Sequence, residues 1–176
     1  MLCIYNTYIK TNNDIDVIVT NNSTLERNQK IFNVSAASLT GSSITIHLGS
    51  SVIAETNSIF SNGAELTITN TGTIEATNSK AINVSNSDGV SITNNNNGVI
   101  KSNNNTILGD AGTGADNVTI DNSGEIYTTA TGTESSAIVF ANNDTGNTIT
   151  NNSGGEIYSS GSESTIVLGV SSTLTN

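Results

Sequence analysis

The sequence predicts an all-β fold, namely a parallel β-solenoid, expected as a right-handed three-sheet β-helix with about six coils of 22–29 residues. Residues 118–140 and 148–168 repeat nearly the same order of strand, Asn-Ser-Gly turn, Glu-Ile-Tyr, polar loop and strand. Short apolar runs alternate with Thr and Ser at a period of two, which is typical of strands with one buried face. The chain has 28 Asn, 24 Ser and 26 Thr, and these residues with Gly favour tight turns between short strands.

Composition limits the partners of the chain. The hydrophobic share is 34% and the charged share 11%, but Ile, Val and Thr recur regularly, which favours an ordered β protein over disorder. Five Lys and Arg against fifteen Asp and Glu give a net charge of −10, so we expect no nucleic-acid partner. Cys3 is the single cysteine, which excludes an internal disulfide and a cysteine zinc cluster. No stretch reaches the roughly 18 apolar residues of a membrane-spanning helix.

Three columns of apolar residues define the repeat. The first comprises Val19, Ile46, Ile68, Ile92, Ile120, Ile149 and Leu174. The second comprises Leu25, Ile53, Ile74, Ile100, Ile126 and Ile157. The third comprises Ile31, Ile59, Ile82, Ile107, Ile138 and Ile166. Each unit therefore carries three strands that are too short to bury a face alone, and stacking of the units about 4.8 Å apart gives three parallel sheets.

An asparagine follows the first column in most units. We expect these residues to form a structural ladder of stacked amides, with a left-handed backbone that suits a sharp turn. The ladder comprises Asn21, Asn70, Asn94, Asn122, Asn151 and Asn176, and Leu48 interrupts it. Insertions are expected to collect between the second and third columns, in loops Thr128–Ala137 and Ser159–Thr165, and to project from one edge of the rod.

The two ends of the chain are expected to differ from the repeats. Residues 1–16 are expected to be an irregular N-terminal segment without a signal peptide, followed by solenoid repeats over residues 17–176. Thr173–Asn176 begin a further unit, and no cap for the exposed strands is evident. We therefore expect a fragment of a longer solenoid, with self-association along the rod as one consequence of open strand edges.

Four segments are variants of an Ile-Thr-Asn-x-Gly-x-Ile unit, with turns of different length and one Asp in place of Thr: "ITNTGTIEA", "ITNNNNGVIKS", "IDNSGEIYTT" and "ITNNSGGEIYSS". On these segments the sequence resembles the β-helix passenger region of bacterial autotransporter adhesins, of the type V secretion group. The resemblance covers about residues 17–176. It implies an extracellular or cell-surface location, a signal sequence, and attachment to the outer membrane through a C-terminal barrel domain that this chain does not contain.

Two pairs of side chains are candidates for ligand contact. Glu125 and Glu156 are expected to stack on adjacent coils, where they are either solvated surface acids or a site that shares a proton or cation. Tyr127 and Tyr158 occupy the neighbouring column and either pack on the strand or contact a sugar or protein. No basic residue shares the glutamate column, although Lys101 lies one place further along on an earlier coil.

The remaining candidates point away from catalysis. His47 is the single histidine, is expected to be exposed, and has no nucleophile motif beside it. We therefore expect a non-enzymatic protein without catalytic residues, cofactor or metal. A Thr-x-Thr face resembles that of ice-binding solenoids, but Ile18, His47 and Asp121 are expected to interrupt it.

The expected function is structural and adhesive. A surface-exposed β-helix segment presents loops beside Tyr127 and Tyr158 for binding to host cells, a matrix protein, a glycan or neighbouring bacteria. The alternatives are a carbohydrate-active enzyme that uses Glu125 and Glu156, and ice binding by the Thr-x-Thr face.

Overall fold

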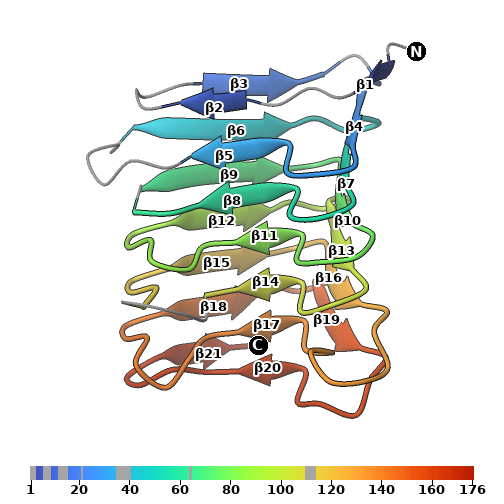
Figure 1. Ribbon diagram of the computed structural model, residues 1–176. Coiled ribbons are helices and arrows are strands. Elements are labelled where there is room, and N and C mark those ends of the chain that lie inside the picture. The colour runs from blue at the N-terminus through green and yellow to red at the C-terminus, as the bar shows by residue number, and fades with distance from the viewer. Residues whose placement is uncertain are drawn as a thin grey trace.

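The computed structural model describes residues 3–5, 9–11, 16–20, 22–34, 41–63, 65–109 and 114–176. The described chain is all-β, contains no helix, and winds into a parallel β-solenoid of about six turns, as the sequence predicts. Figure 1 shows the coils stacked in sequence order, so that segments one coil apart in the sequence lie side by side. Each of the three sheets contains seven parallel strands.

The strands follow one another around the rod in the order sheet A, sheet B, sheet C. Sheet A comprises β1 (Cys3–Tyr5), β4 (Thr24–Arg27), β7 (Ser51–Ala54), β10 (Thr73–Ala76), β13 (Val99–Ser102), β16 (Glu125–Thr128) and β19 (Glu156–Ser159). Sheet B comprises β2 (Ile9–Thr11), β5 (Phe32–Val34), β8 (Ile59–Ser61), β11 (Ile82–Asn83), β14 (Ile107–Leu108), β17 (Ile138–Val139) and β20 (Ile166–Val167). Sheet C comprises β3 (Asp16–Val19), β6 (Ser42–Ile46), β9 (Leu66–Asn70), β12 (Ser91–Asn94), β15 (Thr119–Asn122), β18 (Thr148–Asn151) and β21 (Thr173–Thr175).

Two strands lie within residues 1–16, the segment expected to be irregular. Strand β1 pairs in parallel with β4, with Cys3 opposite Thr24, and β2 pairs with β5, with Ile9 opposite Phe32. Sheets A and B therefore begin before the first unit that the apolar columns identify.

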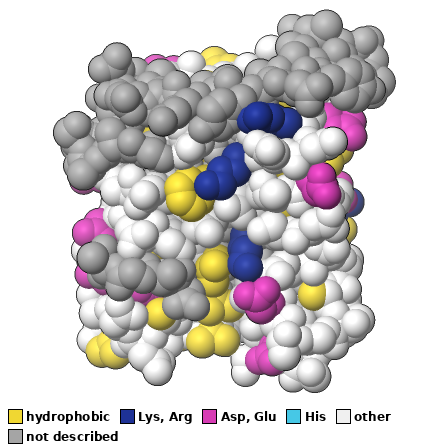
Figure 2. All heavy atoms as spheres, viewed as in Figure 1, with side chains coloured by type: hydrophobic (Ala, Val, Ile, Leu, Met, Phe, Trp, Pro, Cys, Tyr) yellow, Lys and Arg dark blue, Asp and Glu magenta, His cyan; other side chains and the backbone are white. Residues whose placement is uncertain are grey.

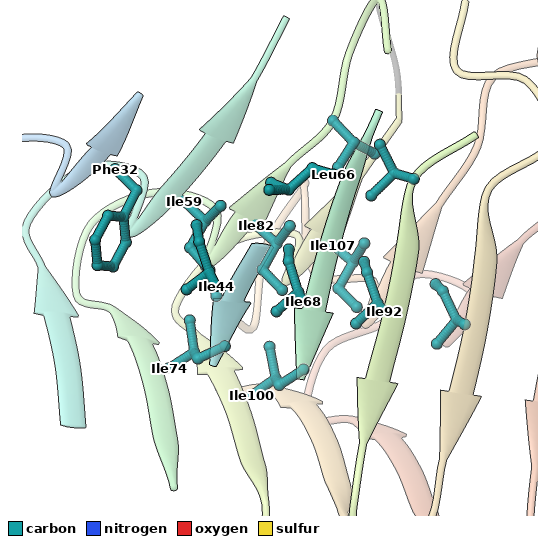
Figure 3. Close-up of a cluster of buried hydrophobic side chains, with 14 of the residues drawn as sticks. Phe32, Ile44, Ile59, Leu66, Ile68, Ile74, Ile82, Ile92, Ile100 and Ile107 are labelled. Carbon is teal, nitrogen blue, oxygen red and sulfur yellow. The ribbon is translucent and has the colours of Figure 1, made fainter. Parts of the chain in front are cut away.

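The core is a stack of like side chains, which Figure 3 shows for three of the columns. The inward position of sheet C is filled by Ile44, Ile68, Ile92, Ile120 and Ile149, all fully buried. Sheet A contributes Val52, Ile74, Ile100 and Ile126, and sheet B contributes Phe32, Ile59, Ile82, Ile107 and Ile138. Buried isoleucines in one column contact the isoleucines of the coils before and after, because a parallel in-register strand repeats its side-chain direction.

The pairing register corrects the predicted columns in the first two coils. Val17 and Ile44, rather than Val19 and Ile46, pair with the column of Ile68. The cause is that Ile44-Thr-Ile46 places two apolar residues on the same inward face, so alternation alone fits either choice. Counted along sheet C, the coil that ends at Ile68 therefore has 24 residues, from Ile44, although the same coil counted along sheet A has 22, from Val52 to Ile74.

Two single-residue slips are corrected in the same coils. Val52 points inward and is fully buried, while the predicted Ile53 pairs with Glu75 and is half-buried on the outer face. Phe32, and not Ile31, pairs with Ile59 in sheet B. A shift of one residue moves a side chain to the opposite face of a strand, so the slip at Ile53 had exchanged the inner and outer surfaces. Ile31 is also fully buried, just before β5, so the second slip changes the register but not the burial.

Variation in loop length is not confined to one corner, contrary to the prediction. Between sheets A and B the long connections are residues 129–137 and 160–165. Between sheets B and C the connections 109–118 and 140–147 have ten and eight residues, compared with nine and six residues for the two connections between sheets A and B. The strands stay in register on both sides of each insertion, so loops change length without disturbing the stack.

Candidate functional site

A ladder of buried asparagine amides runs along the corner between sheets C and A. Asn70 Nδ2 donates to Asn94 Oδ1 at 2.9 Å, and Asn94 Nδ2 donates to Asn122 Oδ1 at 2.8 Å. The series continues from Asn122 to Asn151 at 2.8 Å and from Asn151 to Asn176 at 2.7 Å. Asn70, Asn94 and Asn122 are fully buried, so every bond in this part of the ladder is shielded from water.

The start of the ladder differs from the prediction. Asn21 lies outside the described residues, and the ladder position in the first two coils belongs to Val19 and Ile46, which pair with each other and then with Asn70. Leu48, predicted to interrupt the ladder, is instead an exposed turn residue with 65% of its surface accessible. The interruption is real, but an apolar core residue rather than Leu48 causes it.

The ladder asparagines also do not adopt the left-handed backbone that was expected. The left-handed asparagines among the described residues lie elsewhere, at Asn22, Asn86, Asn97 and Asn117. Asn70 acts through its side chain, because its Oδ1 accepts the N–H of Gly72 at 3.1 Å and its Nδ2 donates to Val99 O at 3.2 Å. The asparagine column therefore stabilises the turns between sheets C and A by side-chain hydrogen bonds, and its role is structural.

A glycine column stands beside the ladder and explains the Gly-x-Ile part of the repeat. A Cβ added to Gly124 would lie 2.2 Å from Gly98 O and 2.6 Å from Asn95 O, and one added to Gly72 would lie 2.3 Å from Ser50 O. These atoms belong to the backbone of the preceding coil and cannot move aside as a flexible side chain does. Glycine is therefore required here for close stacking of the coils.

Turns of unequal length at this corner create a groove. Residues 95–98 and 152–155 form long turns, while only Ser123 and Gly124 connect β15 to β16 on the coil between them. The short turn leaves a hollow of about 330 Å³ between its longer neighbours. The lining comprises Asn96, Asn97, Gly98, Val99, Ser123, Gly124, Glu125, Gly154 and Glu156. Both predicted glutamates thus line a single groove.

Glu125 and Glu156 are direct partners in the pairing of β16 with β19, and both are exposed. One position along, Tyr127 pairs with Tyr158, and their rings stack with 4.7 Å between centroids and 5° between planes. Tyr158 Oη lies 3.3 Å from Glu125 Oε2 and donates to it. Partial burial, and after it the charge of Glu125, raises the pKa of Tyr158 to about 12. The structure therefore brings together all four residues that the sequence singled out.

The stacking restricts how the tyrosines can contact a ligand. Because the rings lie parallel on successive coils, the face of Tyr127 toward Tyr158 is covered, and a sugar ring cannot stack on it. The hydroxyl and ring edge of Tyr158, which is 38% exposed, remain accessible beside Glu125. Because β19 is the last described strand of sheet A, the far face of the Tyr158 ring also lies beyond this stack, and a ligand can contact that face or the Glu125 and Tyr158 oxygens.

Lys101 continues the tyrosine column toward the N-terminal coils. It pairs in register with Tyr127 on one side and with Glu75 on the other, and its Nζ lies 3.0 Å from Glu75 Oε2. These side chains border a second hollow of about 240 Å³, which Thr77 and Thr129 also line. Sequence analysis noted Lys101 but missed its ion pair, because the pairing of Glu75 with Lys101 depends on the register between coils.

The longer predicted loop is tied to the rod. Glu134, in the connection 129–137, accepts a hydrogen bond from Asn104 Nδ2 at 2.7 Å and lies 3.3 Å from Lys80 Nζ. The hydrogen bond from Asn104, followed by the charge of Lys80, outweighs partial burial and lowers the pKa of Glu134. The loop therefore lies along the sheet A to sheet B corner over two earlier coils.

The outer face of sheet C carries two columns of hydroxyl side chains. One comprises Ser43, Thr67, Ser91, Thr119, Thr148 and Thr173, and the other comprises Thr45, Thr69, Thr93, Asp121, Thr150 and Thr175. His47, expected to interrupt this face, lies in the turn after β6 and is exposed, because Thr45 takes the register position next to Thr69. Beyond Ile18 in the first coil, Asp121 interrupts the array.

Acidic, His and Cys side chains are scattered over the described part of the rod. None of them form a group of three that could hold a metal ion. Over the part of the chain that the structure describes, no helix has the length and apolarity to cross a membrane.

Comparison of the chain with protein-family models, with curated proteins and with solved structures gives no match. The inference of function therefore depends on the geometry of the rod and its surfaces. The groove lined by Glu125 and Glu156 was not predicted from the sequence. The sequence does contain a signal for it, namely turns of unequal length on successive coils: Asn-Asn-Asn-Asn-Gly, Asn-Ser-Gly and Asn-Asn-Ser-Gly-Gly.

Proposed function

We propose that the chain is a rigid, surface-exposed β-helix segment with a structural and adhesive role, as in the passenger region of a bacterial autotransporter adhesin. The observation that supports it is the contrast between an invariant interior and a varied exterior. All three sheets keep seven strands in parallel pairing, while the outward column of sheet A changes from Ile53 to Glu75, Lys101, Tyr127 and Tyr158. A stable rod with one chemically varied face suits presentation of a binding surface.

The binding surface that we propose is the groove together with the Tyr158 edge. Glu125, Glu156 and Tyr158 offer exposed oxygen atoms, and the turn residues Asn96 and Asn97 offer amide groups. Acceptors and donors in a shallow groove suit the hydroxyls of a neutral glycan on a cell surface or in the matrix. An extracellular location follows from this proposal.

The test compares binding of the protein and of a Glu125→Gln, Glu156→Gln double variant to immobilised glycans, matrix proteins and intact cells. We expect at least tenfold weaker binding, since each exposed acceptor lost to a ligand hydroxyl reduces the affinity. A Glu26→Gln, Glu65→Gln double variant is the matched control, because both residues are exposed and lie outside the groove and the predicted loops. Equal binding by the Glu125→Gln, Glu156→Gln variant and the control excludes the groove as the site.

Variants with shortened loops distinguish ligand binding at the groove from ligand binding at the two predicted loops. Shortening both Thr128–Ala137 and Ser159–Thr165 abolishes binding if these loops hold the ligand, as the sequence led us to expect. Retained binding in the shortened protein, together with its loss in the glutamate variant, assigns the contact to the groove.

A carbohydrate-active enzyme at the same glutamates is the alternative that these variants also address. Incubation of glycans with the protein, followed by analysis of the products, detects turnover directly. We propose binding without turnover because both carboxylates are exposed to solvent in a shallow groove, which does not exclude water from a reacting bond. Cleavage that disappears in the glutamate variants would falsify the non-enzymatic proposal.

Ice binding is a second candidate that one observation favours. The hydroxyl columns of sheet C are continuous from Thr45 and Ser43 onward except at Asp121, so the irregular coil lengths do not break the face. A measurement of ice-crystal growth tests it, with Thr93→Tyr to disturb the face and Thr77→Tyr, in a different corner, as control. Growth unaffected by the protein removes this candidate.

A further inference from the structure

The second hollow, of about 240 Å³, lies on the other side of sheet A from the groove. The groove is at the corner where the chain enters the strands of sheet A, and the second hollow is at the corner where it leaves them. Strand β13 places Val99 in the groove and Lys101 in the second hollow. Strand β16 does the same with Glu125 and Tyr127. The groove and the second hollow are therefore the two ends of one surface.

The second hollow offers hydrogen-bonding groups without a net charge. Its two charged side chains, Lys101 and Glu75, form an ion pair at 3.0 Å. The hydroxyls of Thr77 and Thr129 donate to backbone carbonyls of the preceding coil at 3.5 and 3.2 Å, so their oxygens remain as acceptors. Asn103 is exposed and adds an amide group. This lining suits the hydroxyls of a neutral sugar.

The separation of the groove and the second hollow sets the length of a ligand that contacts both. Strands β13 and β16 each have four residues, so their ends are roughly 10 Å apart at about 3.3 Å per residue. A single sugar ring is shorter than this distance. A ligand that contacts both is therefore an extended chain of at least three sugar units, which crosses sheet A along the direction of its strands.

The distribution of charge narrows the class of sugar. All five Lys and Arg precede residue 102, whereas eight of the fifteen Asp and Glu follow it. Figure 2 shows the Lys and Arg side chains of one face in its upper and middle part, with acidic groups toward the edges and in the lower part. The coils of β16 and β19, in the lower half of Figure 1, thus contain acidic residues and no basic ones. An acidic sugar is repelled here, and a neutral sugar is not.

We propose that the groove and the second hollow together bind a neutral linear oligosaccharide of at least three units. The inference rests on the proposed function, because it takes the groove as the contact for one end of the glycan. Glu125 and Glu156 accept hydrogen bonds from the hydroxyls at that end. Asn103 and Thr129 contact the hydroxyls at the other end. The gain in affinity of the oligosaccharide over a single sugar comes from the second hollow.

The test measures the binding of the full chain to an array of neutral linear glycans, in which each series runs from one to five sugar units. In the series that binds, affinity should rise at least tenfold from one unit to three, because the added units gain hydrogen bonds in the second hollow. Equal affinity for one unit and three overturns this inference and leaves the groove as the site. Failure of every series at every length overturns the proposed function as well.

Thr129→Trp is designed to fill the second hollow, because Thr129 is exposed and lines it. This variant should bind the trisaccharide no more tightly than the single sugar, with its affinity for the single sugar unchanged. Thr133→Trp is the matched control, because Thr133 is exposed in the same connection and lines neither the groove nor the second hollow. Equal binding of the trisaccharide by the two variants excludes the second hollow and overturns the inference.

Asn103→Ala tests the second hollow without added bulk. It should weaken trisaccharide binding about fivefold, since one amide is lost, and leave the single sugar unaffected. Asn143→Ala, an exposed residue of the connection 140–147 that lines neither site, is its control. An equal effect of the two alanine variants contradicts a contact at Asn103.

This inference and the proposed function fail in different ways. The Glu125→Gln, Glu156→Gln variant should weaken binding of the single sugar and of the trisaccharide alike, whereas Thr129→Trp should affect the trisaccharide alone. Tighter binding of a trisaccharide that contains glucuronate, or of one that contains an unacetylated amino sugar, than of its neutral counterpart contradicts the neutral class of ligand.

Discussion

Asn94 donates from its side-chain amide to Oδ1 of Asn122, 28 residues later, at 2.8 Å in the fully buried corner between sheets C and A. The same Nδ2 also reaches Gly98 O and Glu125 O, each at 3.1 Å. One amide therefore joins its own turn to the next coil. The ladder gives the stack a polar seam in which each residue depends on its neighbours above and below.

Replacing Asn94 by Ala should lower the free energy of unfolding by about 2–3 kcal/mol, because buried groups on Asn70, Asn122 and two carbonyls lose their partner. Urea unfolding with a check that the m-value is unchanged measures the loss. Asn96→Ala, in the exposed part of the adjoining turn, should change the stability by less than about 0.5 kcal/mol. A similar loss in both variants contradicts a structural role for the ladder.

Gly124→Ala should destabilise the protein by about 1–3 kcal/mol, since the new methyl group meets backbone oxygens of the preceding coil. Gly132→Ala is the matched control, because nothing lies within 4 Å of a Cβ at that position. The control is expected to be neutral or to stabilise by less than about 1 kcal/mol. Thermal unfolding of the two variants side by side decides whether close stacking is the reason for the glycine.

Ile74→Ala and Ile53→Ala test the corrected register of sheet A. Ile74 is fully buried and its truncation should cost about 2–5 kcal/mol. Ile53 points outward on the neighbouring strand, so the identical change should cost less than about 1 kcal/mol. Equal losses in the two variants, measured by denaturant unfolding, imply that Ile53 and not Val52 faces the core.

The raised pKa of Tyr158 predicts a loss of stability in alkaline solution. Its folded pKa of about 12 lies above the ordinary value of 10.0, so the folded state favours the neutral phenol. This contribution is fully present below pH 10 and is lost as the pH rises through the window up to about 12. NMR titration of the Tyr158 phenol should give a pKa of about 12. Glu125→Gln should lower that pKa, and Glu156→Gln should do so less, because Glu156 contributes least among the causes.

The lowered pKa of Glu134 predicts the opposite dependence in acid. The stabilising contacts with Asn104 and Lys80 are present above the ordinary pKa of a glutamate and are lost as the pH falls through the depressed value. Asn104→Ala and Lys80→Met should each raise the pKa of Glu134, since each removes an interaction that favours the carboxylate. NMR titration of the Glu134 carboxyl measures both. An unchanged pKa in Asn104→Ala contradicts the hydrogen bond from Asn104 as the largest single cause.

Much of the architecture follows from the sequence because stacking repeats the same choice in every coil. From Ile68 onward the predicted first column agrees with the pairing of Ile92, Ile120 and Ile149. The first two coils were misaligned because their turns lack the Asn-x-Gly signal, and Ile44 and Ile46 compete for one inward position. The alternation of apolar and polar residues predicts the strands of these two coils. Their register follows only from the pairing of strands between coils.

The candidate site, like the register of the coils, was predicted from the sequence only in part. The pairing of Glu125 with Glu156, and of Tyr127 with Tyr158, follows from two nearly identical segments one coil apart. The groove does not, because its shape arises from a short turn between two longer ones on separate coils.

The strands of each sheet are hydrogen-bonded to the coils before and after them, so their bonds run along the rod. A pulling force applied along the axis is therefore shared by three ladders at once. When the end coil yields, its 24–29 residues become slack of roughly 80–100 Å, against an advance of about 4.8 Å for the intact coil. Under a pulling force the protein should therefore lengthen in steps, one coil at a time, while the coils that have not yet unfolded keep their structure.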